Sequence, residues 1–240
     1  MRRRFLLYCG VTASLLYIAI NIFTPFLYEG YDWITQTVSE LSAVDAPTRP
    51  LWVVLATVYT LLIAAFGWGI LKSAGLRRSL NMVGILLIIN GLFGLTWSPM
   101  HQREVLAAGG GTFTDTWHIV MSVITVLLMF LAIGFGAAAF GKGFRIYSIA
   151  TLLVFIVFGV LTFSEAPNIN KNLATPFIGL WERINIAAFM VWLLVFAIIL
   201  LRKKKPSLSL VKKDIIKEEQ MVNKQNVETK DTIHKPEWLL

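Results

Sequence analysis

Long apolar stretches alternate with short polar connections along most of this chain. A membrane-spanning helix needs about 20 apolar residues, because the hydrocarbon core is about 30 Å thick and every backbone polar group in it must be hydrogen-bonded within the segment. Six stretches meet this requirement: 5–27, 51–71, 80–96, 117–140, 146–163 and 179–201. The pattern therefore predicts an all-α fold, an integral membrane bundle of six transmembrane helices.

The first polar connection, residues 28–49, has a helical pattern of its own. Ile34, Val38 and Leu41 recur at helical spacing, with hydroxyl residues between them. This spacing favours a short helix that lies at the membrane surface. The apolar run before it is too long for a cleaved signal and is followed by further spans, so we expect it to be retained as the first helix.

Composition agrees with a membrane protein, since 56% of the 240 residues are hydrophobic and only 15% are charged. The distribution of charge predicts the orientation, because cytoplasmic loops carry an excess of Lys and Arg. With six spans, one side collects the basic turns: Arg2, Arg3, Arg4, Lys72, Arg77, Arg78, Lys142, Arg145 and 202–205. The other side collects the carboxylates that precede the tail: Glu29, Asp32, Glu40, Asp45, Glu104, Asp115, Glu165 and Glu182.

Both termini are therefore expected in the cytoplasm of a multi-pass protein of the cell membrane. Residues 1–201 form the predicted transmembrane domain, and residues 202–240 a basic, partly disordered cytoplasmic tail. The net charge of +8 follows from this topology, so the lipid bilayer is the expected partner and nucleic acid is not.

Candidate chemistry is concentrated on the outer side, in the stretch 97–118. His101 and His118 are the two histidines outside the tail, and Asp115 precedes His118 by three residues, which places the two on one helix face. An imidazole oriented by a carboxylate can act as a base or bind a metal. His101, Asp115 and His118 are thus candidate catalytic residues and candidate ligands of a metal such as zinc, with Glu40 or Glu182 as a fourth group.

Ser39 is a candidate nucleophile, because a serine needs a histidine base within hydrogen-bond reach and both histidines lie on the same side of the membrane. Simpler roles stay open for this set. Asp115 can cap the fourth span, His118 can be an interfacial side chain bonded to it, and His101 can be a solvated loop residue.

Asp32, Glu40, Glu182 and Arg183 form a second candidate group on the outer side. Glu182 and Arg183 lie about one turn into the last span, where a charge normally faces the bundle interior or pairs with a partner. The four side chains could bind a ligand, or they could form an ion-pair network with a purely structural role.

Two features resemble a known family: YDWITQTVSELSAVDAP after the first span, and the later order of WSPMHQRE, TDTWH and GLWERIN. Together with six spans, they are similar to the prokaryotic membrane family named "domain of unknown function 998", over residues 5–201. The resemblance implies a fold and a topology, and it brings no activity. A weaker similarity is to ceramidase-like transmembrane hydrolases, whose zinc site uses three histidines, an aspartate and a serine. The third histidine is missing here, since His234 lies in the tail.

Two functions follow from these observations. One is a multi-pass membrane protein whose outer polar cluster binds a small ligand, a lipid or an ion, or serves as a structural network. The other is a membrane-embedded, metal-dependent hydrolase that acts on lipid.

Overall fold

The computed structural model describes residues 2–203, and in this part of the chain every regular element is helical, as predicted. The 3₁₀ helix η1 (Thr24–Leu27) continues the first long helix, and the 3₁₀ helix η2 (Val38–Ser42) lies in the first connection. The α-helices are α1 (Arg2–Phe23), α2 (Arg49–Ala74), α3 (Arg78–Gly94), α4 (Arg103–Ala107), α5 (Phe113–Ala137), α6 (Lys142–Ile169) and α7 (Ile178–Arg202). The expected tail lies outside the described residues, apart from its first two.

Six long helices occupy the six predicted positions, and five of them are long and apolar enough to cross a membrane. The exception is α3, which has 17 residues and is therefore roughly 25 Å long. Many of the apolar side chains on the outside of the bundle are exposed, including Phe5, Val54, Leu127, Leu153 and Phe163. The bundle thus has the apolar outer surface that is typical of membrane proteins.

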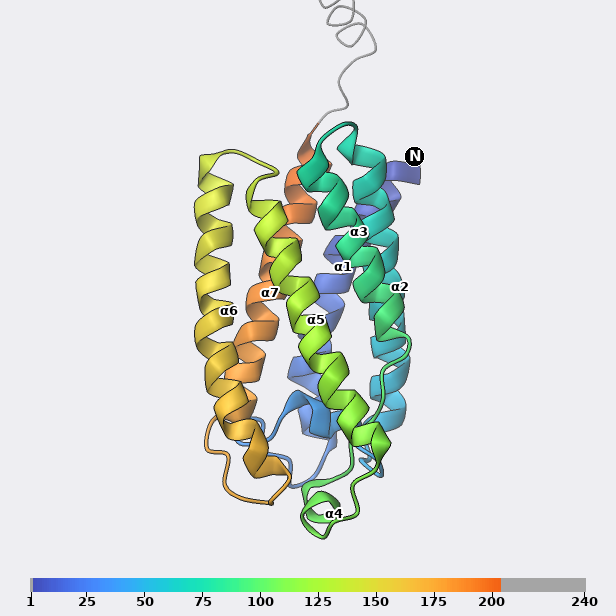
Figure 1. Ribbon diagram of the computed structural model, residues 1–240. Coiled ribbons are helices and arrows are strands. Elements are labelled where there is room, and N and C mark those ends of the chain that lie inside the picture. Colours follow the sequence, from blue (N-terminus) through green and yellow to red (C-terminus); the bar gives the residue numbers. More distant parts are fainter. Residues whose placement is uncertain (1, 204–240) are drawn as a thin grey trace, which may run out of the picture. The chain divides into compact units, whose positions relative to one another are not determined.

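The long helices run alternately up and down, so that all the longer connections lie at one end (Figure 1). We call this end the loop end; it carries residues 24–48, 95–112 and 170–177. The start of α1 and the end of α7 lie at the opposite end, which we call the termini end. Arg3 joins them there, because its Nε donates to Ser73 Oγ at 2.9 Å and its Nη2 to the Leu200 carbonyl at 3.5 Å.

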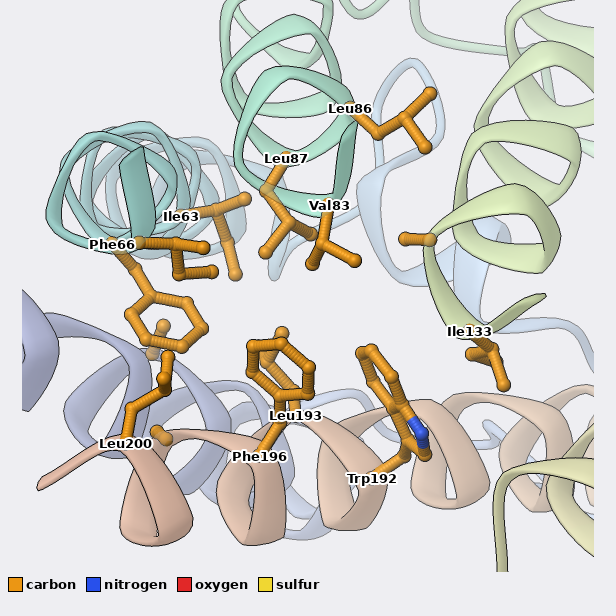
Figure 2. Packing of buried hydrophobic residues seen from close by; sticks show 14 of the residues in the cluster. Ile63, Phe66, Val83, Leu86, Leu87, Ile133, Trp192, Leu193, Phe196 and Leu200 are labelled. Carbon is orange, nitrogen blue, oxygen red and sulfur yellow. The ribbon is translucent and has the colours of Figure 1, made fainter. Parts of the chain in front are cut away.

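Large apolar side chains fill the space between α2, α3, α5 and α7 (Figure 2). Phe66 from α2 packs edge-on against Phe196 from α7. Trp192 lies fully buried beside them, and its indole N–H donates to Ser148 Oγ of α6 at 3.0 Å. Aromatic rings thus form much of the centre of the bundle, between the loop end and the termini end.

Small residues bring α2 and α3 into close contact. A Cβ added at Gly67 would lie 2.6 Å from the Gly84 carbonyl oxygen, and one added at Gly91 would lie 2.6 Å from the Thr60 carbonyl oxygen. Glycine at these positions lets the two backbones approach, as in many membrane helix pairs. Beyond Gly94 the chain leaves the helix and continues as a coil to α4 (Figure 1).

Two elements differ from the prediction. The first connection does not place a helix on the surface: only Val38–Ser42 is helical, and Leu41 is fully buried. Leu41 packs with Ile20 and Trp52, so its apolar face is covered by the bundle instead of by lipid. The fifth span is longer than predicted, because α6 begins at Lys142 and continues through Pro167 to Ile169.

Candidate functional site

The loop end is organised around a buried carboxylate, Glu40. Its side chain is 1% exposed and pairs with Arg103, whose Nε and Nη2 donate to the two carboxylate oxygens at 2.5 and 2.9 Å. Thr37 caps η2 and donates to Glu40 from both its backbone N–H and its hydroxyl. Both oxygens of the Glu40 carboxylate thus accept hydrogen bonds from groups of the protein itself.

Arg103 extends this contact to the other connections. Its Nη1 donates to Thr175 Oγ1 at 2.7 Å, and its Nη2 donates to the Thr35 carbonyl at 3.0 Å. Thr175 in turn donates to the same carbonyl at 2.7 Å. One guanidinium therefore ties together the connections before α2, before α5 and before α7.

The other predicted ligand-binding residues also bond within the loop end. Glu182 Oε2 accepts the Val38 backbone N–H at 2.6 Å, and Asp32 accepts from the Ile34 N–H and from the Thr35 hydroxyl. Arg183 donates to the carbonyls of residues 33 and 36. Within residues 2–203, the expected network among Asp32, Glu40, Glu182 and Arg183 is not formed as ion pairs; these side chains hold backbone groups in place, and Glu40 pairs with Arg103.

Tyr31 completes this part of the loop end. Its hydroxyl donates to the Thr37 carbonyl at 2.7 Å and accepts from Arg183 Nη2 at 2.7 Å. Burial raises the pKa of the Tyr31 phenol, so the hydroxyl stays protonated and keeps its role as a donor.

The predicted pair of Asp115 and His118 is not made; each takes another partner. Thr112 and Asp115 form a capping box at the start of α5, in which Asp115 Oδ2 accepts the Thr112 N–H at 2.7 Å. Asp115 also accepts from the backbone N–H of His101 at 2.7 Å and contacts His101 Nδ1 at 2.9 Å. This pair closes the loop 101–115 onto the start of α5.

His118 is 4% exposed and lies one turn further into α5. Its Nδ1 is 2.6 Å from the Ser98 carbonyl oxygen, and its Nε2 is 3.1 Å from Ser39 Oγ. The ring of Trp97 packs edge-on against the imidazole, with 4.9 Å between the centroids. The structure therefore brings together Ser39 and His118, two residues that lie 79 positions apart in the sequence.

The predicted metal ligands do not converge. His101 and Asp115 touch each other, while both nitrogens of His118 face oxygens of serine residues. In the part of the chain that the structure describes, no three His, Cys, Asp or Glu side chains are grouped as a metal ion requires. The geometry gives the zinc hypothesis no support.

A cavity of about 210 Å³ lies beside this cluster, far larger than the roughly 15 Å³ that one water needs. Five helices wall it, α1, α2, α3, α5 and α7, and most of its lining is apolar. Gly91 and Gly94 line one side and offer no side chain to fill the space. Trp97, which packs on His118, also lines the cavity, so the two features adjoin.

Arg49 and Tyr59 are the polar lining residues that matter most. Arg49 Nη1 and the Tyr59 hydroxyl are buried and have no hydrogen-bond partner. The two ion pairs within residues 2–203 lie elsewhere, so no carboxylate balances Arg49.

Neither Arg49 nor the cavity was singled out from the sequence, although the position of Arg49 in the sequence is unusual. Arg49 opens α2, where a cation opposes the helix dipole and gains nothing from helix formation.

The comparisons with known proteins bear on family and not on activity. No curated protein and no solved structure matches the chain. The model of one family, described as "Protein of unknown function (DUF998)", matches residues 11–199. These residues include α2, α3, α5 and α6 entire and all of the loop end described above. The chain belongs to this DUF998 family, as predicted from the segment YDWITQTVSELSAVDAP and the order of WSPMHQRE, TDTWH and GLWERIN.

Proposed function

We propose that this protein is a multi-pass protein of the cell membrane that binds an anionic amphiphile, a lipid with a phosphate or carboxylate group, at its loop end. In this proposal all six long helices cross the bilayer, and residues 1–201 form the transmembrane domain. The termini end faces the cytoplasm, residues 202–240 form a cytoplasmic tail, and the loop end faces outward.

The distribution of charge over the bundle supports this orientation. Arg3, Lys72, Arg77, Lys142 and Arg202 lie at the termini end of the helices, which matches the excess of basic residues in cytoplasmic loops. The carboxylates of the described residues lie at the loop end.

The unbalanced charge of Arg49 is the observation that carries the ligand proposal. An arginine at the edge of a membrane bundle normally pairs with a carboxylate, a carbonyl or an anionic ligand, because its charge is costly there. Glu40 has no free oxygen to offer, since Arg103 and Thr37 occupy it. A phosphate or carboxylate supplied by a ligand is the partner that fits, and guanidinium binds both in a two-pronged manner.

The rest of the cavity suits an acyl chain. Its inner wall is formed by apolar side chains, among them Ile63, Met129 and Met190. Val53 and Leu95 also line it and are 49% and 47% exposed on the outside of the bundle. A chain that enters beside these two residues comes from the bilayer, so the ligand needs no passage through water.

The test is thermal unfolding of the purified protein in a neutral detergent, with three added amphiphiles: phosphatidylglycerol, oleate and phosphatidylcholine. A ligand that binds the folded state raises the apparent Tm as its concentration rises above its Kd. We expect a rise with phosphatidylglycerol or oleate, and little with zwitterionic phosphatidylcholine. The stronger of the two anionic compounds identifies the headgroup as phosphate or carboxylate.

Arg49→Gln keeps much of the side-chain volume and removes the charge, so it should abolish the rise in Tm. Lys171→Gln is the matched control, because Lys171 is an exposed cation in the connection before α7. The proposal would be contradicted if the anionic amphiphiles raised the Tm of Arg49→Gln as much as that of the unaltered protein. It would also be contradicted if phosphatidylcholine raised the Tm of the unaltered protein as much as the anionic amphiphiles do.

A further inference from the structure

The hydrogen bond between Ser39 and His118 runs in the direction expected of a serine nucleophile and its histidine base. The carbonyl oxygen of Ser98 can only accept a hydrogen bond, so His118 Nδ1, 2.6 Å away, carries the proton. In the neutral imidazole Nε2 is then the acceptor, and the Ser39 hydroxyl donates to it at 3.1 Å. Serine hydrolases use this arrangement, with a third group that fixes the tautomer of the histidine.

Both side chains are held in place by their surroundings. Ser39 lies in η2, where Glu182 binds the N–H of the preceding residue and Arg103 binds the carboxylate of the following one. His118 is fixed by the Ser98 carbonyl on one side and by the Trp97 ring on the other. The loop-end contacts thus serve a second purpose, because a nucleophile and base react fast only when their geometry is set in advance.

Access distinguishes the two residues. His118 is buried, whereas Ser39 is only partly covered. A substrate would therefore approach this pair from the side of Ser39. His101 and Asp115 bond to each other and form no hydrogen bond with Ser39 or with the imidazole of His118.

We propose that Ser39 is a nucleophile and His118 its general base, in a metal-free hydrolysis of a carboxylic ester. Ser39 Oγ bonds to the ester carbonyl carbon while its proton passes to His118 Nε2. The bond to the alcohol oxygen then breaks, and the leaving alcohol takes that proton, which leaves an acyl-serine. Water attacks the acyl-serine and gives a proton to Nε2; the bond to Oγ breaks, the proton returns to Ser39, and a carboxylic acid is released.

The substrate class follows from the adjoining cavity, and this part rests on the proposed function. Trp97 contacts His118 and lines the cavity, and Ser42, one turn after Ser39, lines it as well. An amphiphile whose chain lies in the cavity brings its headgroup region to this end of the bundle. The substrate is therefore an ester of an amphiphile, such as an acylated lipid.

The experiment is labelling of the full-length purified protein with a fluorophosphonate, which forms a bond to an activated serine Oγ and loses fluoride. Mass spectrometry of the digested protein locates the adduct. We expect an adduct at Ser39, none in Ser39→Ala, and a rate in His118→Gln that is lower by about 100-fold or more, the usual contribution of a general base. Ser164→Ala is the control, because Ser164 is an exposed serine at the loop end.

A second variant guards against misfolding of His118→Gln. In Ser39→Cys the new thiol should react with iodoacetamide faster than in Ser39→Cys combined with His118→Gln, with helical content by circular dichroism equal in both. The inference is overturned if Ser39 gains no adduct in the folded protein. It is also overturned if His118→Gln changes neither the rate of fluorophosphonate labelling nor the rate of iodoacetamide alkylation.

Two probe lengths separate this inference from the proposed function. A diisopropyl probe needs no cavity, while a long-chain alkyl probe gains from it. Faster labelling by the long probe, with that advantage lost on addition of oleate, supports both. Equal labelling of Ser39 by both probes supports the nucleophile and contradicts the cavity ligand. Stabilisation by an anionic amphiphile without any adduct leaves the ligand site standing and overturns the nucleophile.

Discussion

At the scale of single residues, Glu40 depends on Arg103. Replacing Arg103 by Gln leaves a carboxylate that is 1% exposed without its cation, and removing one partner of a buried pair costs about 3–5 kcal/mol. We expect a clear fall in the apparent Tm of the purified protein, because three connections lose their common anchor. Thermal unfolding followed by circular dichroism measures the change.

The control for this change is Lys171→Gln, which removes an exposed charge at the same end and should alter the Tm little. Combining Arg103→Gln with Glu40→Gln removes both charges, so part of the lost stability should return. If Arg103→Gln and Lys171→Gln unfolded at the same Tm, the pair of Arg103 and Glu40 would contribute nothing to stability.

Several residues of the loop end, such as Glu40, Asp115 and His118, could be named from the sequence, but their partners could not. Asp115 and His118 share a helix face, yet Asp115 caps the helix and binds His101, while His118 turns to Ser39. These choices depend on how loops far apart in the chain fold over one another, and residue spacing carries no record of that. Arg49 was missed because its significance lies in the partner that it lacks.

At the scale of elements, the packing of α2 on α3 depends on glycine. A Cβ at Gly67 would lie 2.6 Å from the Gly84 carbonyl oxygen and 2.9 Å from the Ile88 backbone nitrogen, so one of the two helices must move. Gly67→Ala should lower stability by about 1–3 kcal/mol, the usual cost of overpacking. Unfolding in detergent, monitored by circular dichroism, tests this.

Gly134→Ala is the matched control, since a Cβ at this position in α5 meets nothing within 4 Å. There alanine should leave the stability unchanged or raise it by up to about 1 kcal/mol, because glycine is a poor helix former. Equal effects at the two glycines would mean that close contact of α2 and α3 does not limit stability.

Helices were more predictable than the short elements between them. The six apolar runs mark the six long helices because membrane helices need continuous apolar sequence. The pattern of residues 34–42 predicts a surface helix, but Val38 and Leu41 face the bundle, Glu40 is buried as well, and only Val38–Ser42 is helical. Whether an apolar face turns to lipid or to protein is decided by the surrounding helices, and both environments select the same residues.

At the scale of the whole molecule, charge divides the bundle into two ends. Within residues 2–203, basic residues predominate at the termini end, whereas the carboxylates lie at the loop end together with Arg49, Arg103, Lys171 and Arg183. The positive-inside rule converts this division into an orientation. The orientation matters for function, because it decides whether the cavity and Ser39 meet the outer leaflet or the inner one.

The orientation and the role of α3 can be tested together with single cysteines in a Cys9→Ala background, which removes the one native cysteine. Leu76 precedes α3 and is fully exposed, and Glu104 follows it and is also exposed. If α3 crosses the bilayer despite its 17 residues, a membrane-impermeant maleimide added to intact cells labels Glu104→Cys and spares Leu76→Cys until the cells are permeabilised. The reverse pattern would invert the orientation and put the cavity in the inner leaflet. Equal labelling of both positions would mean that α3 does not cross, since the two ends of a spanning helix cannot share one side.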